Sequence, residues 1–108
     1  MESRRDVFQA IADPTRRGIL TMLIQQPRNL NTIAENFNMT RQGISLHVKI
    51  LEECNVISIR RQGRERYCDL NAKKIAEIAD WLEPFQKMWE GRFSQLDNLL
   101  HTLKRKSK

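Results

Sequence analysis

The hydrophobic period of this chain changes from helical to extended near Asn55, and that change limits the folds open to it. Before Asn55, apolar residues recur at helical spacing. After it, two β-capable runs, 56–61 and 64–70, flank Gln62-Gly63, which is a Gly-containing turn signal. Helical spacing resumes at Ala72. The sequence therefore predicts several helices, then a β-hairpin, then further helix.

Polar residues mark the expected helix starts, since Asp, Asn and Thr side chains accept the free N–H groups of a first turn. Proline suits the first helical position because it lacks an N–H that would be unpaired there. The expected N-caps are Asp13 before Pro14, either Asn29 or Asn31, Thr40, and Asn71. We expect helices over about 7–12, 14–25, 31–37, 40–54 and 72–82, and a separate last helix over 84–104, because Pro84 removes a donor and clashes one turn back.

This order of elements predicts a mainly α fold with a small β-hairpin: a winged helix-turn-helix with an extended C-terminal dimerisation helix. At 108 residues the chain fits a single winged-helix DNA-binding domain, with a core over 1–71 and C-terminal helices and a basic tail over 72–108. We expect a cytoplasmic protein, since no apolar run approaches the roughly 18 residues that span a bilayer and no signal-peptide core follows the charged N-terminus. Cys54 and Cys68 are then expected to be reduced.

The helix predicted from Thr40 meets the requirements of a recognition helix, whose N-terminal residues contact base edges in the major groove. Ile44, Val48 and Leu51 form an apolar face that would dock it on the core. The opposite face has side chains that pair with bases or phosphates and no acidic residue before Glu52. An ordinary solvated helix face would look similar. The residues on the predicted reading face are Arg41, Gln42, Ser45, Leu46 and Lys49, with Thr40 at its start. His47 lies at the edge between the docking and reading faces, where it would make either a structural hydrogen bond or a phosphate contact.

The predicted hairpin favours the DNA-binding interpretation. Arg60, Arg61, Arg64 and Arg66 are crowded around its turn, and Glu65 is the only acidic residue among them. Crowded like charges cost free energy unless a polyanion neutralises them, and the net charge of the chain is +6. Such a wing suits phosphates or a minor groove. Arg61, Arg64 and Arg66 are therefore added to the candidate DNA contacts.

Three segments resemble the arsenical-resistance repressor (ArsR/SmtB) family of winged-helix regulators, in the right order. They are the opening Val7–Leu20 with Asp-Pro-Thr-Arg-Arg, the helix Thr40–Leu51 with Ser45 and His47, and the wing Arg60–Arg64. The resemblance implies a homodimeric repressor that occupies palindromic operator DNA until a signal releases it. It implies DNA contacts at Thr40, Arg41, Gln42, Ser45 and His47, with Arg61 and Arg64 from the wing.

The chain departs from the metal sensors of that family. They have a Cys-x-Cys pair at the start of the third helix, where this chain has Asn29-Leu30-Asn31. Other members use His and acidic ligands on the last helix, where this chain has only His101. We therefore expect no metal and no other cofactor. Oxidation of Cys54 or Cys68 is a further, weaker hypothesis for a signal.

The last helical segment has a heptad pattern typical of a coiled-coil surface, interrupted by Arg92. Packing within its own domain is one explanation, and pairing with the same helix of a second copy is the one we favour. A ligand cleft between the paired terminal helices, lined by Trp81, Phe85, Met88 and Trp89, is a further alternative. The expected dimer interface consists of Phe8, Ile11, Leu82, Phe85, Trp89, Phe93, Leu96, Leu99, Leu100 and Leu103.

Three other classes of function fit the sequence less well. An enzyme would need a catalytic constellation, and His47 and His101 lie on different helices without an evident carboxylate partner. A winged helix that binds only another protein would not need the basic wing. A membrane-surface role for the basic tail lacks apolar anchors. We expect double-stranded DNA and a second copy of the chain as partners, and no membrane.

Overall fold

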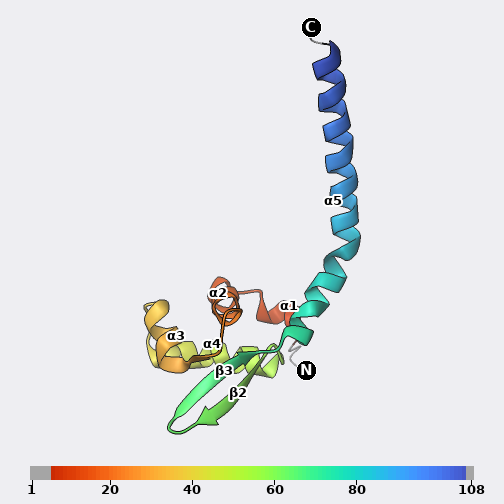
Figure 1. Cartoon of the computed structure of the whole chain (residues 1–108). Helices are drawn as coiled ribbons and strands as arrows, with labels where there is room; N and C mark the ends of the chain where they lie inside the picture. The colour runs from red at the N-terminus through yellow and green to blue at the C-terminus, as the bar shows by residue number, and fades with distance from the viewer. Residues whose placement is uncertain (1–5, 107–108) are drawn as a thin grey trace. The chain divides into compact units, whose positions relative to one another are not determined.

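The computed structural model describes residues 6–106 and confirms the predicted fold class. It is mainly helical, with one small antiparallel sheet and a long C-terminal helix (Figure 1). The chain divides into two compact units after Ile78, and each is described by itself. No helix within residues 6–106 has the length and apolar character needed to cross a membrane.

The two N-terminal helices, α1 (Val7–Ala10) and α2 (Pro14–Leu23), are joined by a tight polar connection. Asp13 caps α2 as expected, its side chain accepting the Arg16 N–H at 3.1 Å, and Pro14 begins the helix. The Arg16 guanidinium then reaches back and donates to the carbonyls of Ala10 and Gln9, both at 3.0 Å. Arg17 donates to the Ile11 carbonyl at 2.7 Å. These bonds link the end of α1 to the first turn of α2.

The helix-turn-helix consists of α3 (Leu30–Asn36) and α4 (Arg41–Glu53). Of the two caps considered for α3, the structure has Asn29, whose side chain accepts the Thr32 N–H. Thr40 caps α4 as expected. Both helices end with an asparagine at positive φ, Asn38 at 51° and Asn55 at 64°, a conformation that Asn tolerates better than most residues.

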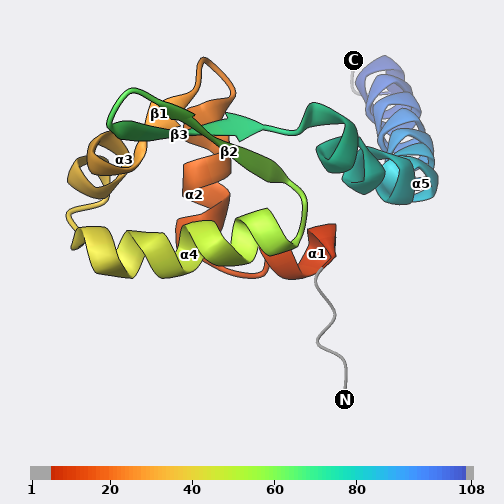
Figure 2. The same ribbon diagram turned by 90° about the horizontal axis from the view of Figure 1, so that it is seen from below.

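The wing is the hairpin of β2 (Ile57–Gln62) and β3 (Glu65–Leu70), and its tip extends beyond the helices (Figure 1). The turn lies one residue later than predicted, because Gly63, with φ of 65°, takes the first loop position. Glycine at the first central position is the preference of type II′ hairpin turns. A third strand, β1 (Arg28–Asn29), was not predicted. It pairs with β3, so that the strands lie in the order β1-β3-β2 (Figure 2).

The expected break at Pro84 is wrong, since α5 runs as one helix from Ala72 to Lys106 (Figure 1). Proline removes one helical hydrogen bond and crowds the preceding turn, at a cost of roughly 3 kcal/mol. A helix of 35 residues keeps its other hydrogen bonds on both sides and tolerates that local loss. Asn71 lies directly before α5, and its backbone carbonyl accepts the N–H groups of Lys74 and Ile75. Its side chain donates to the Asn55 carbonyl at 2.8 Å, which joins the start of α5 to the end of α4.

The core of the first unit is formed by apolar residues from every one of its elements except β1. Ile44, Val48 and Leu51 contribute the apolar face of α4, as expected. The other buried residues are Val7, Ala10, Ile19, Leu20, Leu23, Leu30, Ile33, Ala34, Cys54, Val56, Ile57 and Cys68. This packing fixes which side of α4 remains in solvent.

Candidate nucleic-acid interface

Helix α4 has one buried face and one polar face exposed to solvent. Burial of its apolar residues leaves the side chains of Arg41, Gln42 and Lys49 exposed, with Ser45 half-buried between them. Leu46 lies on the exposed side and is 68% exposed. An exposed leucine among hydrogen-bonding side chains is suited to contact a thymine methyl group. The predicted reading face is therefore accessible.

The first turn of α4 is tightly built around Gly43. The Thr40 hydroxyl accepts the Gly43 N–H at 3.1 Å. A Cβ added at Gly43 would lie 3.2 Å from the Met39 methyl carbon and 3.3 Å from that same hydroxyl oxygen. Glycine therefore lets the cap and Met39 close over the helix start. The sequence showed only that Gly43 is a poor helix former, and the need for a close fit becomes visible in three dimensions.

One face of the wing is neutralised by contacts within the sheet. Arg60 donates to the Asp69 carboxylate at 2.8 Å and to the Gln62 side chain at 2.6 Å, and its guanidinium lies 5.0 Å from the centre of the Tyr67 ring. Glu65 accepts the Tyr67 hydroxyl at 3.0 Å. The two acidic residues of the wing, Glu65 and Asp69, and one of its arginines are thus engaged on this face.

The other face of the wing presents arginines that oppose one another. Arg61 of β2 and Arg66 of β3 are register partners, so like charges lie directly across the strand pair. Arg64 lies in the turn, and all three residues are exposed. Within residues 6–106 no hydrogen bond or ion pair engages these three guanidinium groups. A phosphate backbone would neutralise such positive charges, which have no acidic partner within residues 6–106.

A cleft of about 340 Å³ brings the wing and the recognition helix together. Ser45 and Lys49 line it from α4, and Arg66 lines it from β3. These three predicted DNA contacts therefore share one surface. The remaining lining residues are Leu30, Val48, Glu52 and Ile59.

His47 differs in its environment from the other residues predicted to contact DNA. Its side chain is 22% exposed, and its Nδ1 lies 3.8 Å from the Asp13 carboxylate at the start of α2. The hydrogen bond from the Arg16 backbone lowers the pKa of Asp13 below 3.8, and the charges of His47 and Arg16 act in the same direction. The structure therefore gives His47 an intramolecular partner that the sequence did not indicate.

The two cysteines lie in the core and are free thiols. Burial, together with the nearby carboxylates of Asp69 and Glu52, raises the pKa of Cys68 to about 11. A thiol with so high a pKa is a poor nucleophile near neutral pH, which weakens the redox hypothesis for Cys68. No group of three or more His, Cys, Asp or Glu side chains suited to a metal ion occurs in residues 6–106.

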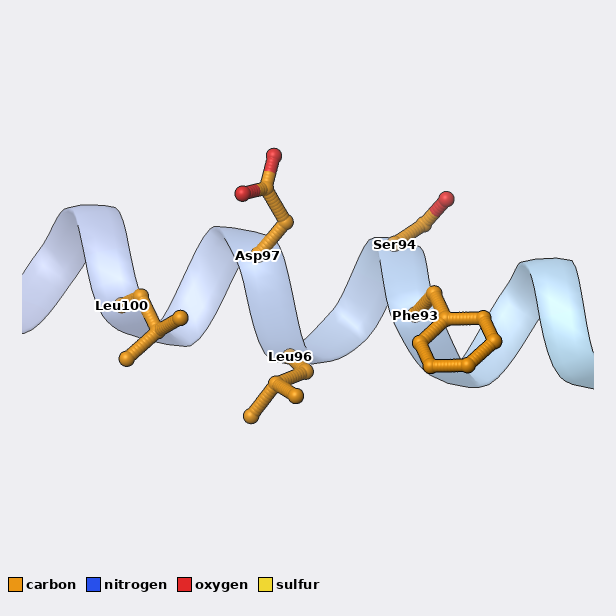
Figure 3. A pocket seen from close by; sticks show the side chains of 5 residues that line it. All are labelled: Phe93, Ser94, Leu96, Asp97 and Leu100. Atoms are coloured by element: carbon orange, nitrogen blue, oxygen red, sulfur yellow. The ribbon is translucent and has the colours of Figure 1, made fainter.

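The apolar stripe of α5 is exposed to solvent along the second unit. Phe93, Leu96 and Leu100 line a hollow with Ser94 and Asp97, all from this one helix, so the hollow is open rather than an enclosed cavity (Figure 3). The large apolar side chains of the stripe are between 39% and 69% exposed; they are Phe85, Trp89, Phe93, Leu96, Leu99, Leu100 and Leu103. Phe8, from the first unit, is 40% exposed, whereas Ile11 and Leu82 are half-buried.

The four residues considered for a ligand cleft between paired helices all lie on α5. Trp81 and Phe85 pack with ring centroids 4.9 Å apart, and Met88 and Trp89 are 40% and 45% exposed. A different pocket, of about 230 Å³, lies in the first unit between α2, the end of β3 and the start of α5. Of the predicted interface residues, only Ile11 lines it.

Comparisons with known proteins agree with this architecture. Residues 11–59 match the family model described as a helix-turn-helix domain. The transcriptional repressor SdpR of Bacillus subtilis (strain 168) is 40% identical over 80 residues, which cover 74% of this chain and 89% of that protein. The arsenical resistance operon repressor of the same organism is 33% identical over 69 residues, which cover 63% of this chain and 66% of that one.

Solved structures give the same result. A crystal structure of an ArsR family transcriptional regulator is 35% identical, with a TM-score of 0.67, and the match covers 77% of this chain and 86% of that one. The resemblance noted from the Asp-Pro-Thr-Arg-Arg segment, the recognition helix and the wing is thus confirmed by overall sequence and fold. The chain belongs to the ArsR family of helix-turn-helix transcriptional regulators.

Proposed function

We propose that this protein is a homodimeric repressor that occupies a palindromic operator in the cytoplasm, acting by binding DNA rather than by catalysis. In each protomer α4 enters the major groove and the wing contacts the adjacent backbone or minor groove. The observation that supports this most is the shared surface of α4 and β3, where Ser45, Lys49 and Arg66 line one cleft beside exposed Arg41 and Gln42.

Each part of that surface has a different task. Arg41 and Gln42 lie in the first turn of α4, where side chains of a recognition helix reach base edges, so they are the candidates for sequence readout. Thr40 and the open N–H groups of the same turn suit a phosphate. Arg61, Arg64 and Arg66 supply charge without sequence information. A winged helix that binds only a protein would not need three exposed arginines without an acidic partner on its wing.

The exposed stripe of α5 supports the dimer. Full burial of each large apolar side chain would contribute about 1.5–3 kcal/mol, so several residues from two copies are enough to hold a pair. Because Leu82, Trp89, Leu96 and Leu103 repeat at heptad spacing, the same helix of a second copy is a complementary surface. Two-fold symmetry would then place two α4 helices about one DNA turn apart, or a multiple of it.

The decisive experiment is a salt titration of binding to a duplex taken from upstream of the protein's own gene, compared with a scrambled duplex. We expect a preference of roughly a thousandfold or more and a steep salt slope. Weak and equal binding to both would leave only the electrostatic contribution, and the operator would be sought genome-wide. Absence of binding at low salt would contradict the proposal and favour a protein partner.

The dimer is tested separately by sedimentation. The double variant Trp89→Ala, Leu96→Ala should sediment as a monomer and lose operator affinity. The control is Ile24→Ala, which removes an exposed apolar side chain from outside α5, at 69% exposure. A double variant that remains dimeric would place the interface elsewhere.

The signal that releases DNA is not expected to be a metal ion. Our expectation that no metal is involved is tested by titrating zinc calorimetrically. Stoichiometric, sub-micromolar binding that disappears in His101→Gln would contradict it. A small molecule, a partner protein or the protein's own concentration would each be compatible with the surfaces described.

A further inference from the structure

We propose that His47 is a positioning residue: in its protonated form it pairs with Asp13 and holds α4 against the α1–α2 connection, so that DNA binding strengthens as the pH falls from 8 to 6. This inference rests on the proposed function, because it concerns how the reading helix of that function is held. It assigns to His47 a role other than the direct DNA contact expected from the sequence.

The first observation is an unpaired nitrogen. Nδ1 of His47 is buried and has no hydrogen-bond partner. Buried polar atoms in folded proteins are nearly always satisfied, so an exception calls for an explanation. The Asp13 carboxylate is the group that faces this nitrogen, and at 3.8 Å the two atoms are too far apart for a hydrogen bond. A proton on Nδ1 would turn this separation into an ion pair that a small side-chain movement could close.

The second observation concerns the charged groups around the pair. The residues one turn before and after His47 on α4 are Gly43, Ile44, Ile50 and Leu51, and none is charged. From α2 and the connection before it, Asp13 faces the imidazole, and Arg16 is the other charged side chain that acts on the same carboxylate. Asp13 is thus the ion-pair partner of His47 within residues 6–106.

The third observation is what Asp13 is attached to. It caps α2 through the Arg16 N–H, and the Arg16 guanidinium holds the carbonyls of Gln9 and Ala10 at the end of α1. A continuous set of polar contacts therefore leads from α1, which contributes Phe8 to the expected dimer interface, to the middle of α4. Imidazole is the side chain whose ordinary titration falls between pH 5 and 8, so protonation can tighten this link under physiological conditions.

The test begins with a double-mutant cycle in the DNA-free full-length chain, using His47→Gln, Asp13→Asn and the double variant. Asn is as good an N-cap as Asp, so Asp13→Asn keeps the cap of α2 while removing the charge. We expect the coupling in the folding equilibrium, measured by urea denaturation, to be about two- to fivefold at pH 5.5 and absent at pH 8. Equal coupling at both pH values, or none at either, would overturn the inference.

Operator binding is then measured from pH 5.5 to 8. Wild type should bind about two- to fivefold more tightly at the low end than the pH trend of His47→Gln accounts for, and Asp13→Asn should lose this excess. The matched control is His101→Gln, which removes the chain's other histidine, an exposed one with its own aspartate, Asp97, 3.7 Å away. That variant should keep the excess.

Salt dependence separates positioning from direct contact. If His47 touches a phosphate, His47→Gln will lower the salt slope by about 0.9 per protomer, and Asp13→Asn will keep the pH profile of the wild type. That pair of results would overturn the inference while leaving the proposed function intact. If no duplex is bound specifically at any pH, the proposed function fails, and the cycle in the free protein alone decides whether the His47–Asp13 pair depends on protonation.

Discussion

Arg60 and Arg66 lie on opposite faces of the same hairpin, and exchanging each for glutamine should have opposite consequences. Arg66 directly opposes Arg61 across the strand pair and lines the cleft beside α4. Arg60 is bonded to Asp69 and lies over the Tyr67 ring. The first arginine therefore has a repulsive neighbour in the free protein, whereas the second has attractive ones.

The magnitudes follow from these contacts. Removing a like-charge pair directly across two strands should stabilise the free protein by about 0.2–1 kcal/mol in Arg66→Gln. Arg60→Gln loses a hydrogen-bonded ion pair and a cation–π contact, and should cost about 0.5–1.5 kcal/mol. In DNA binding, the variant that loses an interaction is Arg66→Gln rather than Arg60→Gln. Arg66→Gln should lower the salt slope by about 0.9 per protomer, and Arg60→Gln should leave it unchanged.

Two assays on the same preparations decide the matter. Urea denaturation gives the stability of each free variant, and fluorescence anisotropy with a labelled duplex, from about 50 to 200 mM salt, gives the slope. Equal losses of slope in both variants would show that the wing does not present one face to DNA. A destabilised Arg66→Gln would show that the opposed arginines already have a favourable partner.

Three further predictions concern the remaining fold. Gly18→Ala should lower the free energy of unfolding, measured in urea, by up to about 2 kcal/mol, because the new Cβ would lie 2.7 Å from the Phe37 ring. Gly91→Ala, whose new Cβ has nothing within 4 Å, should raise it by about 0.5–1 kcal/mol. Equal gains in stability for both variants would mean that the Phe37 ring moves aside. Cys68, with a pKa raised to about 11, should react with a thiol reagent at pH 8 far more slowly in the folded protein than in urea, and fast labelling would reveal an opening of the core. Because the folded pKa of Asp13 is lowered, the stabilising contribution of its charge is present above the unfolded value near 3.9 and is lost as pH falls through the folded value. The urea midpoints of wild type and Asp13→Asn should therefore converge as the pH falls below about 4, and a difference that stays constant there would contradict this.

The helix starts were predictable because each depends on atoms only a few residues apart. Asp13 accepts the N–H of Arg16, and Thr40 accepts that of Gly43. A side chain that caps a helix three residues ahead leaves its mark in the sequence whatever the rest of the fold does. The same locality explains why the apolar face of α4, at helical spacing, was identified with the correct buried residues.

Features that depend on distant residues were not predictable in this way. β1 is two residues long, and its existence depends on pairing Arg28 with Cys68, far along the chain. The continuity of α5 through Pro84 depends on the cooperativity of a helix much longer than the proline's local effect. The pairing of His47 with Asp13 needs α4 and the start of α2 to be packed together, and neither sequence segment indicates that contact by itself.

In the wing, the arrangement of the arginines depends both on the local alternation of the strand and on the register between the strands. Because successive side chains of a strand point to opposite faces, the sequence alone places Arg60 and Arg61 on opposite faces of the hairpin. Which of the two is neutralised depends on register, and register depends on the turn. A turn at Gln62-Gly63 would have set Arg61 opposite Arg64 and Arg60 opposite Glu65; with Gly63 in the first loop position, Arg61 opposes Arg66 and Arg60 opposes Tyr67. A shift of one residue in the turn therefore decides which arginines are left for DNA, which is why the comparison of Arg60 with Arg66 tests the register and the interface together.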